Sequence, residues 1–240
     1  MKKTIYITVL IVLTSFICSI TSCMDKQPVR GNGTILKKEI QLTEFEKIEL
    51  DGIFKVYLKQ GDASKLEVET DENIIDLIEA NVRSKKLTLK VKKPVHSTRG
   101  IFIYLTFNKI NHLSLAGHTY VVSTDRMNFD QLDLIVSGTS KMISEINAVS
   151  LKVEASGSSS LELSGNVFSA DITASGAAKM NAVNMNIDDL KHSASGTAAT
   201  TVNVISKFDV KASGTAQVQY YGTPEMREEV SGSASVTKKF

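Results

Sequence analysis

The C-terminal half of the sequence repeats a Ser-Gly pair at intervals of 18 to 20 residues. The six serines are Ser137, Ser156, Ser175, Ser195, Ser213 and Ser231. A looser copy, Leu-Ala-Gly at residues 115–117, precedes them by a similar interval. A period near 19 residues is too short for helical-hairpin repeats and is typical of one coil of a β-solenoid.

Chance Ser-Gly pairs are the alternative, and the residues around the serines argue against it. Aligned on the serine, the copies are mostly apolar at five, three and one residues before it, and apolar residues resume five residues after it. This alternation is the periodicity of strands with one buried face. His192 stands in the column three before the serine, between Ile172 and Val210, so we predict that it faces the core. The column one before the serine holds small apolar residues: Val136, Ala155, Ala174, Ala194, Ala212 and Val230.

Charge sign alternates from copy to copy four residues before the serine. The column reads Asp133, Lys152, Asp171, Lys191, Asp209 and Arg227. In stacked coils these residues would lie about 4.8 Å apart, where like charges repel and opposite charges attract. We therefore predict that the coils stack in sequence order. An exposed pair adds only about 0.2–1 kcal/mol, so the column would fix the register without holding the fold together.

The Ser-Gly pair itself is predicted to form a tight corner between two strands. Glycine permits the backbone angles of such a bend, and the small residue before the serine suits the narrow interior of a corner. The alternative is a nucleophilic serine or a phosphate cradle. Six copies of a nucleophile make no chemical sense, and neither Lys-Thr nor His follows at a fixed spacing.

The sequence upstream of the regular repeats alternates in the same way but less regularly. Strand patterns occur around Ile48, Val56 and residues 101–107, with a corner at Gly52. A short helical turn is predicted after Asp71, which would cap it. Together these patterns predict an all-β fold, a right-handed parallel β-helix or β-solenoid with coils of about 18–20 residues. It would span residues 37–240, with irregular early coils at 37–130 and regular coils at 131–240.

The N-terminus has the pattern of a bacterial lipoprotein leader. Lys2 and Lys3 precede an apolar run that is too short for a spanning helix, and Ile-Thr-Ser precedes Cys23. We therefore predict a signal peptide at residues 1–22, lipid attachment at Cys23, and a flexible tether at 23–36. The alternative is an ordinary signal peptide that leaves Cys23 as an unpaired thiol, which is unusual in exported proteins.

Removal of the leader leaves 26 basic and 26 acidic residues, a net charge of zero. This balance gives no general attraction to nucleic acid, so no nucleic-acid partner is expected. With one cysteine left, the mature chain cannot form an internal disulfide. We predict that the lipid anchor holds the protein in the cell envelope, at the outer membrane.

Four motifs occur along the chain: Gly52-Ile53-Phe54, Gln60-Gly61, the segment 71–74 and the Ser-Gly series, which together cover roughly residues 40 to 237. In these motifs the chain resembles the autotransporter adhesin "head GIN" domain family of exported bacterial proteins. Phe54 departs from the asparagine of the family name. The resemblance implies a parallel β-helix and an adhesin-like role, and little chemistry.

Two classes of function fit such a fold. The first is a non-enzymatic adhesin or assembly scaffold that uses the long solenoid surface to bind an extended protein or glycan. The second is a polysaccharide-active enzyme of the pectin lyase-like kind. Catalysis there needs clustered carboxylates or basic residues on one face. The outward charges alternate instead, and we predict that the adjacent pair Asp188 and Asp189 lies in a solvated return loop.

Aromatic and metal-binding side chains add little to either reading. The chain has no tryptophan and few aromatic residues, so aromatic platforms on which sugars could stack are scarce. Tyr220 and Tyr221 are the best candidates for such a platform, and the alternative is that they cap the end of the solenoid. The histidines, His96, His112, His118 and His192, share no ligand spacing, and we expect neither a metal nor a cofactor.

Overall fold

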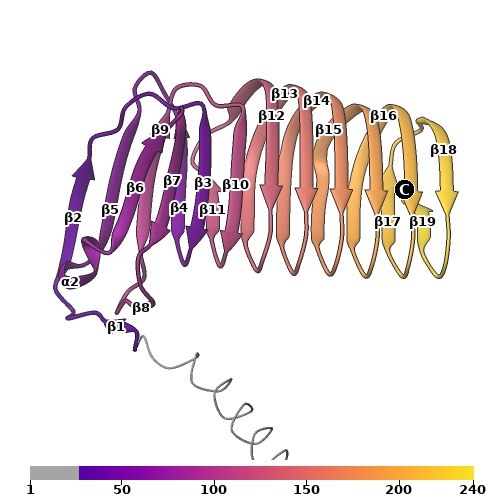
Figure 1. Ribbon diagram of the computed structural model, residues 1–240. Helices are drawn as coiled ribbons and strands as arrows, with labels where there is room; N and C mark the ends of the chain where they lie inside the picture. Colours follow the sequence, from indigo (N-terminus) through magenta and orange to yellow (C-terminus); the bar gives the residue numbers. More distant parts are fainter. Residues whose placement is uncertain (1–26) are drawn as a thin grey trace, which may run out of the picture.

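The computed structural model describes residues 27–240, which form a β-solenoid with one short helix (Figure 1). Cys23 and the predicted signal peptide lie outside the described residues. Within residues 27–240, no helix is both long enough and apolar enough to cross a membrane. The first half of the described chain contains β1 Val29–Arg30, β2 Ile35–Ile40, β3 Lys47–Gly52, β4 Lys55–Gln60, β5 Lys65–Asp71, α2 Glu72–Ile75, β6 Ile78–Arg83, β7 Lys86–Val91, β8 Val95–His96 and β9 Phe102–Phe107. The second half contains β10 His112–Gly117, β11 Tyr120–Ser123, β12 Met127–Val136, β13 Lys141–Ala155, β14 Ser160–Ala174, β15 Lys179–Ala194, β16 Ala199–Ala212, β17 Gln217–Tyr221, β18 Glu225–Val230 and β19 Ser235–Lys238.

The regular coils from β10 onward stack through parallel strands in sequence order. β12 pairs with β13, β13 with β14, β14 with β15 and β15 with β16, and each step advances the chain by one repeat. Leu132 lies opposite Leu151, and Leu151 lies opposite Ala170. The predicted parallel β-solenoid and its repeat length are therefore confirmed.

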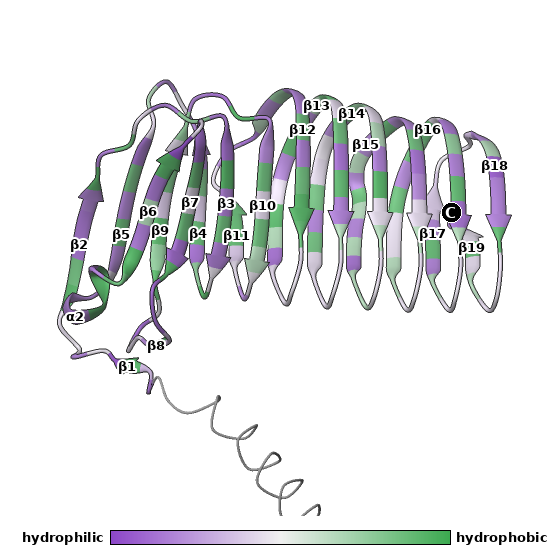
Figure 2. Ribbon diagram, viewed as in Figure 1, coloured by the Kyte–Doolittle hydropathy of each residue, from purple (hydrophilic) through white to green (hydrophobic). Residues whose placement is uncertain are grey.

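The alternating apolar positions point inward, as predicted. Figure 2 shows hydrophobic and hydrophilic bands alternating along the strands. In the column before the serine, Val136, Ala155, Ala174, Ala194 and Ala212 are no more than 3% exposed. The exception is the last copy, Val230, which is 43% exposed in β18. The interior of the coils is thus filled by stacked apolar side chains, and burial of this surface stabilises the fold.

Gly157 and Gly176 show why each corner needs a glycine. Their φ angles are +70° and +68°, in the left-handed region that other residues rarely adopt. A Cβ on Gly157 would lie 2.8 Å from the carbonyl oxygen of Gly138, and one on Gly176 would lie 3.0 Å from that of Gly157. Glycine is therefore required both for the bend and for the direct stacking of one corner on the next.

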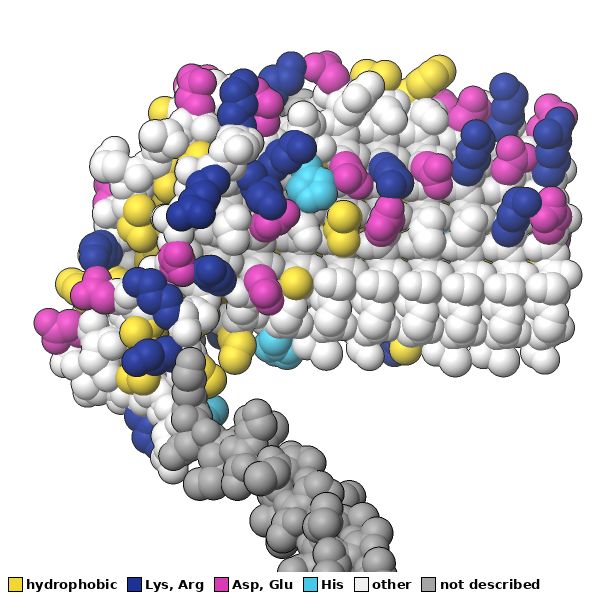
Figure 3. Space-filling view, viewed as in Figure 1, with side chains coloured by type: hydrophobic (Ala, Val, Ile, Leu, Met, Phe, Trp, Pro, Cys, Tyr) yellow, Lys and Arg dark blue, Asp and Glu magenta, His cyan; other side chains and the backbone are white. Residues whose placement is uncertain are grey.

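The column of alternating charge stacks as the sequence predicted. Asp133 lies opposite Lys152, which lies opposite Asp171, and Asp171 lies opposite Lys191. Figure 3 shows the resulting row of acidic and basic side chains along one face. Within the described residues, however, Lys152 does not form an ion pair with Asp133 or Asp171 of the neighbouring coils. Its Nζ lies 2.6 Å from Glu154 Oε1 on its own strand instead.

One contact between side chains of successive coils does form at the start of this row. His112 Nδ1 lies 3.0 Å from Asp133 Oδ2. The column therefore extends one coil further toward the N-terminus than the Ser-Gly pattern indicated.

The N-terminal half departs from the predicted stack of early coils in two ways. First, β2 pairs with β5, β5 with β9, and β6 with β7 in antiparallel orientation. Second, the coils do not stack in chain order, because β3 and β4 lie between β7 and β9 on one side and β10 and β11 on the other. After Gln60 the chain leaves the coil formed by β3 and β4 and forms strands β5 to β9 on its outer side. It then crosses back over that coil and begins β10.

Part of the predicted tether is ordered. β1 pairs with β8, and β2 begins at Ile35, so the described part of the segment 23–36 is bound to the body of the protein. Asn73 fixes it further, since its side chain accepts a bond from the Asn32 N–H and donates one to the Arg30 carbonyl. Residues 29–36 therefore belong to the folded body, not to a tether as predicted.

The short helix after Asp71 is confirmed, but Asp71 does not cap it through its side chain. The buried carboxylate instead accepts hydrogen bonds from the N–H of Gly33 and of Thr98 and from the hydroxyls of Ser97 and Thr98. Burial alone would raise the pKa of Asp71, but these hydrogen bonds hold it well below its usual range. Asp71 thus joins the N-terminal segment to the loop after β8.

Candidate functional site

An open groove lies where the chain crosses back from β9 to β10. It has a volume of about 750 Å³ and is open to solvent along one side. Residues 108–111 of the crossing segment form one wall, and strands β12, β13 and β14 form the other. The groove therefore exists because the N-terminal coils are stacked out of chain order.

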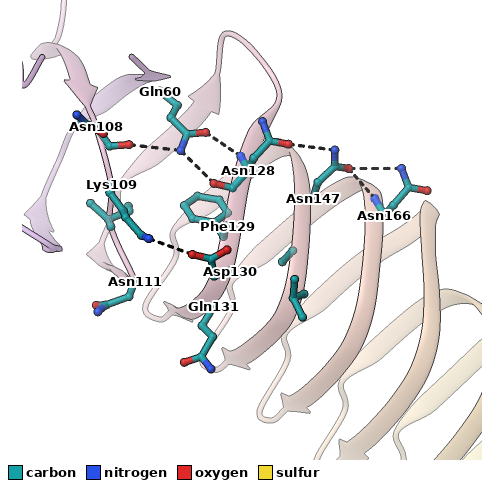
Figure 4. A pocket seen from close by; sticks show the side chains of 13 residues that line it. Gln60, Asn108, Lys109, Asn111, Asn128, Phe129, Asp130, Gln131, Asn147 and Asn166 are labelled. Atoms are coloured by element: carbon teal, nitrogen blue, oxygen red, sulfur yellow. Dashed lines mark hydrogen bonds and ion pairs between the residues drawn. The ribbon is translucent and has the colours of Figure 1, made fainter. Parts of the chain in front are cut away.

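Gln60 fastens the crossing segment to the regular coils. Its side-chain N–H groups donate to the carbonyl oxygens of Asn108 and Asn128, and its side-chain oxygen accepts the N–H of Asn128. Figure 4 shows this amide at the junction between the two walls. All the hydrogen-bonding capacity on its nitrogen is used, so Gln60 is a structural member of the site.

A ladder of asparagines starts at this junction and follows the outer surface of successive coils. Asn147 donates to Asn128 at 3.2 Å, Asn166 donates to Asn147 at 3.4 Å, and Asn186 donates to Asn166 at 3.0 Å. Asn203 continues the series with a 2.9 Å bond to Asn186. These bonds hold the amides in fixed orientations although none of them is buried.

The groove also holds an apolar floor and one ion pair. Phe129 is 8% exposed and stacks on Phe107 with ring centroids 6.3 Å apart. Lys109 Nζ lies 3.0 Å from Asp130 Oδ2, and both side chains are exposed (Figure 4). Because these are the two charged residues of the lining, the groove carries no net charge and presents mainly amides.

Few of the residues singled out in the sequence lie in this groove. Cys23 is outside the described residues, so lipid attachment there stays a prediction. Asp189 lies within β15, not in a return loop as predicted, and is 3.8 Å from Lys207. Tyr220 packs edge-to-face against Phe208 with centroids 5.5 Å apart, and it lies opposite Lys238 of β19, so a further coil lies beyond it.

The histidines make separate contacts in the described structure. His192 is 2% exposed, which confirms that it faces the core, and its Nδ1 lies 3.0 Å from the carbonyl oxygen of Ile172. Burial lowers the pKa of His192 to about 4. His118 Nδ1 lies 2.9 Å from the Thr139 hydroxyl. Within residues 27–240, no three His, Cys, Asp or Glu side chains are grouped closely enough to hold a metal ion.

The amide ladder was missed although the sequence carries its signal. Asn128, Asn147, Asn166 and Asn186 each stand nine residues before the serine of a Ser-Gly pair, and Asn203 stands ten before. The exposed aromatic Phe168 was also missed among the platforms for sugars. The crossing segment had no comparable signal, because nothing in residues 108–111 indicates which coil they cross.

The fold and the groove define a class: a parallel β-solenoid that presents a recessed polar surface on its side. The chain belongs to the family described as "Putative auto-transporter adhesin, head GIN domain", whose model matches residues 44–224. Membership of this adhesin family implies an exported or surface protein. No curated protein matches the chain.

Solved structures share this fold. A putative adhesin from Bacteroides fragilis is 21% identical, with a TM-score of 0.78 over 88% of this chain and 98% of that chain. A putative adhesin from Parabacteroides merdae is 16% identical, with a TM-score of 0.70 over 90% of this chain and 100% of that chain. A protein of Parabacteroides distasonis described as a putative lipid binding protein is 18% identical, with a TM-score of 0.72 over 89% and 100%.

Proposed function

We propose that the protein is an exported lipoprotein, held at the outer membrane through an acylated Cys23, that acts as a non-enzymatic adhesin or binding scaffold. The observation that carries this proposal is the open groove on a rigid solenoid. Three of its amides, Asn128, Asn147 and Asn166, are fixed by the coil-to-coil ladder, so they lose little conformational entropy when a partner binds. The adhesin family supports the same function.

The alternative, a polysaccharide-active enzyme, finds less support in the groove. Hydrolysis of a glycosidic bond by most such enzymes uses two carboxyl groups placed on either side of it. The groove lining contains one carboxylate, Asp130, and that group is paired with Lys109. The described groups whose pKa departs furthest from its ordinary value, Asp71 and His192, are buried elsewhere.

The name of one structural relative suggests lipid binding. In this chain the interior of the coils is filled by apolar side chains such as Leu134, Val153 and Ile172, each 0% exposed. A lipid would therefore have to bind on the outer surface, where the groove is lined mainly by amides. This arrangement favours a polar partner.

The anchor is tested by metabolic labelling with a fatty-acid analogue. Wild-type protein should carry the label, and Cys23→Ala should lose it and appear in the soluble fraction. Label that persists in the variant would refute acylation at Cys23. Protease treatment of intact cells then distinguishes surface display, in which residues 27–240 are cleaved, from residence in the periplasm.

Adhesion is tested with a deletion strain that expresses either wild-type protein or Cys23→Ala. Wild-type protein should increase the number of cells retained on a glycan- or glycoprotein-coated surface, and the unanchored variant should not. Equal retention of the deletion strain and the complemented strain on every coating would contradict the adhesin function.

A further inference from the structure

We propose that the amide-lined groove binds an uncharged polysaccharide that lies across successive coils. This inference rests on the proposed binding function and names its ligand class and site. Two observations support it: several amides of the groove still have free hydrogen-bonding groups, and two exposed apolar side chains lie beside them.

The first observation is the free capacity of the amides. A carboxamide has two N–H donors and an oxygen that accepts two hydrogen bonds. Asn128 accepts a bond from Asn147, but within residues 27–240 neither of its side-chain N–H groups has a partner. Asn111 and Gln131, which also line the groove, have side-chain amides that bond to no group of the described chain. The groove thus offers both donors and acceptors to a ligand.

The second observation is an apolar pair on the column next to the ladder. Val149 and Phe168 stand two residues after Asn147 and Asn166, on the same outer side of their strands, and are 60% and 61% exposed. The pairs that flank them, Ala148 with Val167 and Ser150 with Ser169, place the two side chains on neighbouring coils. Val149 lines the groove, and Phe168 lies beside it on β14, the strand that also contributes Asn166 to the groove.

A sugar matches this combination. Its hydroxyl groups both donate and accept hydrogen bonds, as amides do, and the C–H face of its ring can pack on an aromatic side chain. The ladder repeats these groups at each coil, about 4.8 Å apart, so a chain of repeated units would meet equivalent contacts along its length.

Other polymers fit the site less well. An anionic polymer needs several unpaired cations, whereas the groove offers Lys109, already paired with Asp130. An extended peptide binds sheets mainly by adding a strand to an open edge. Strands β13 and β14 are paired on both sides. β12 pairs with β10 only from Asp133 to Val136, and at the groove the side chain of Gln60 bonds to the N–H and the carbonyl oxygen of Asn128, so no edge long enough for an added strand faces the groove.

The test measures binding of the full-length protein in detergent to soluble neutral polysaccharides, namely glucan, mannan and galactan, by affinity electrophoresis and calorimetry. An anionic polygalacturonate and an unstructured peptide serve as competing probes. We expect at least one neutral polysaccharide to bind and to outcompete both of these. Binding of only the anionic polymer or only the peptide would overturn the proposal, as would no binding to any neutral polysaccharide.

Variants locate the site. Asn111→Ala and Gln131→Ala remove amides that make no side-chain hydrogen bond within the described chain, so each should weaken binding about 3- to 10-fold without lowering the melting temperature. Phe168→Ser should weaken it by about tenfold. The matched controls are Gln217→Ala, an exposed amide on β17, and Ile205→Ser, an apolar residue that is 46% exposed.

Unchanged affinity in all three groove variants, or equal losses in the controls, would overturn the groove as the site. The same variants are then expressed in the cell-retention assay described above. If cells still adhere through the protein while no neutral polysaccharide binds, the polysaccharide inference fails and the adhesin function stands. If the protein has no effect on adhesion at all, the proposed function fails independently.

Discussion

His192 makes the stability of the solenoid depend on pH, and the size of this effect follows from its position. The side chain is buried in the inward column between Ile172 and Val210. Its Nδ1–H donates to the carbonyl oxygen of Ile172, and its Nε2 has no hydrogen-bond partner among the described residues. A proton on Nε2 would place an unpaired charge among apolar side chains, which is strongly unfavourable.

The sign of the effect follows from the two states of the chain. His192 takes up a proton near pH 6.5 in the unfolded chain but only near pH 4 in the folded protein. The free energy of unfolding should therefore be highest above pH 6.5, fall as the pH is lowered to 4, and stay low below that. Because one pKa unit corresponds to about 1.4 kcal/mol, the full loss is about 3 kcal/mol.

The decisive variant is His192→Val, which restores the residue type of the neighbouring positions. Urea unfolding at several pH values between 4.5 and 7.5 should show a slope in the wild type that the variant largely lacks. At pH 5 the variant should be about 2 kcal/mol more stable relative to wild type than it is at pH 7.5. Asp71 does not interfere, because the stability that comes from its lowered pKa is lost only below its ordinary value of 3.8.

An unchanged slope in His192→Val would refute this reasoning and would mean that other groups titrate on unfolding. A slope of opposite sign in the wild type would show that the imidazolium is stabilised in the fold, contrary to the burial of Nε2.

Three further predictions concern the coils. Ala174→Leu should lower the free energy of unfolding by about 1–3 kcal/mol in denaturant melts, because it overpacks a corner where Ala174 is 1% exposed. The outward Thr173→Lys should cost little, and equal losses in the two variants would contradict the inward position of Ala174. Asp171→Lys places three cations in a row, so it should lower the melting temperature slightly and less so in high salt; a deficit that salt leaves unchanged would argue against repulsion between coils. Gly157→Ala should destabilise the protein more than Gly33→Ala does. Both glycines have positive φ angles, but only at Gly157 would the new methyl group clash with a neighbouring backbone. Equal effects would show that the strain of the φ angle alone matters.

The regular coils could be predicted because their contacts repeat with the sequence period. Once the serines are aligned, a residue such as Ala174 is assigned to the interior and Asp171 to the surface by position alone. Strand alternation in the first half carries no such information, because it is the same for parallel and antiparallel partners. The pairing of β5 with β9 and the return across Gln60 therefore could not be deduced from the sequence.

The site illustrates the same limit. The asparagine column repeats with the coils and was open to prediction, whereas the groove requires the wall formed by residues 108–111. Asp71 was assigned as a helix cap from its local position, but its carboxylate is directed to Ser97 and Thr98, which are distant in sequence.

The out-of-order coil also determines when the N-terminal half can be completed. Gly52 pairs with Gly117, so one of the two coils that flank β3 and β4 lies 65 residues further along the chain. Each later coil pairs with residues only about one repeat away. Contacts between residues far apart in sequence form slowly, because a long loop must close first. During synthesis and export the first-made part of the protein therefore holds an open sheet edge until β10 and β11 arrive, and it is in this interval that the chain is most exposed to aggregation and to proteases.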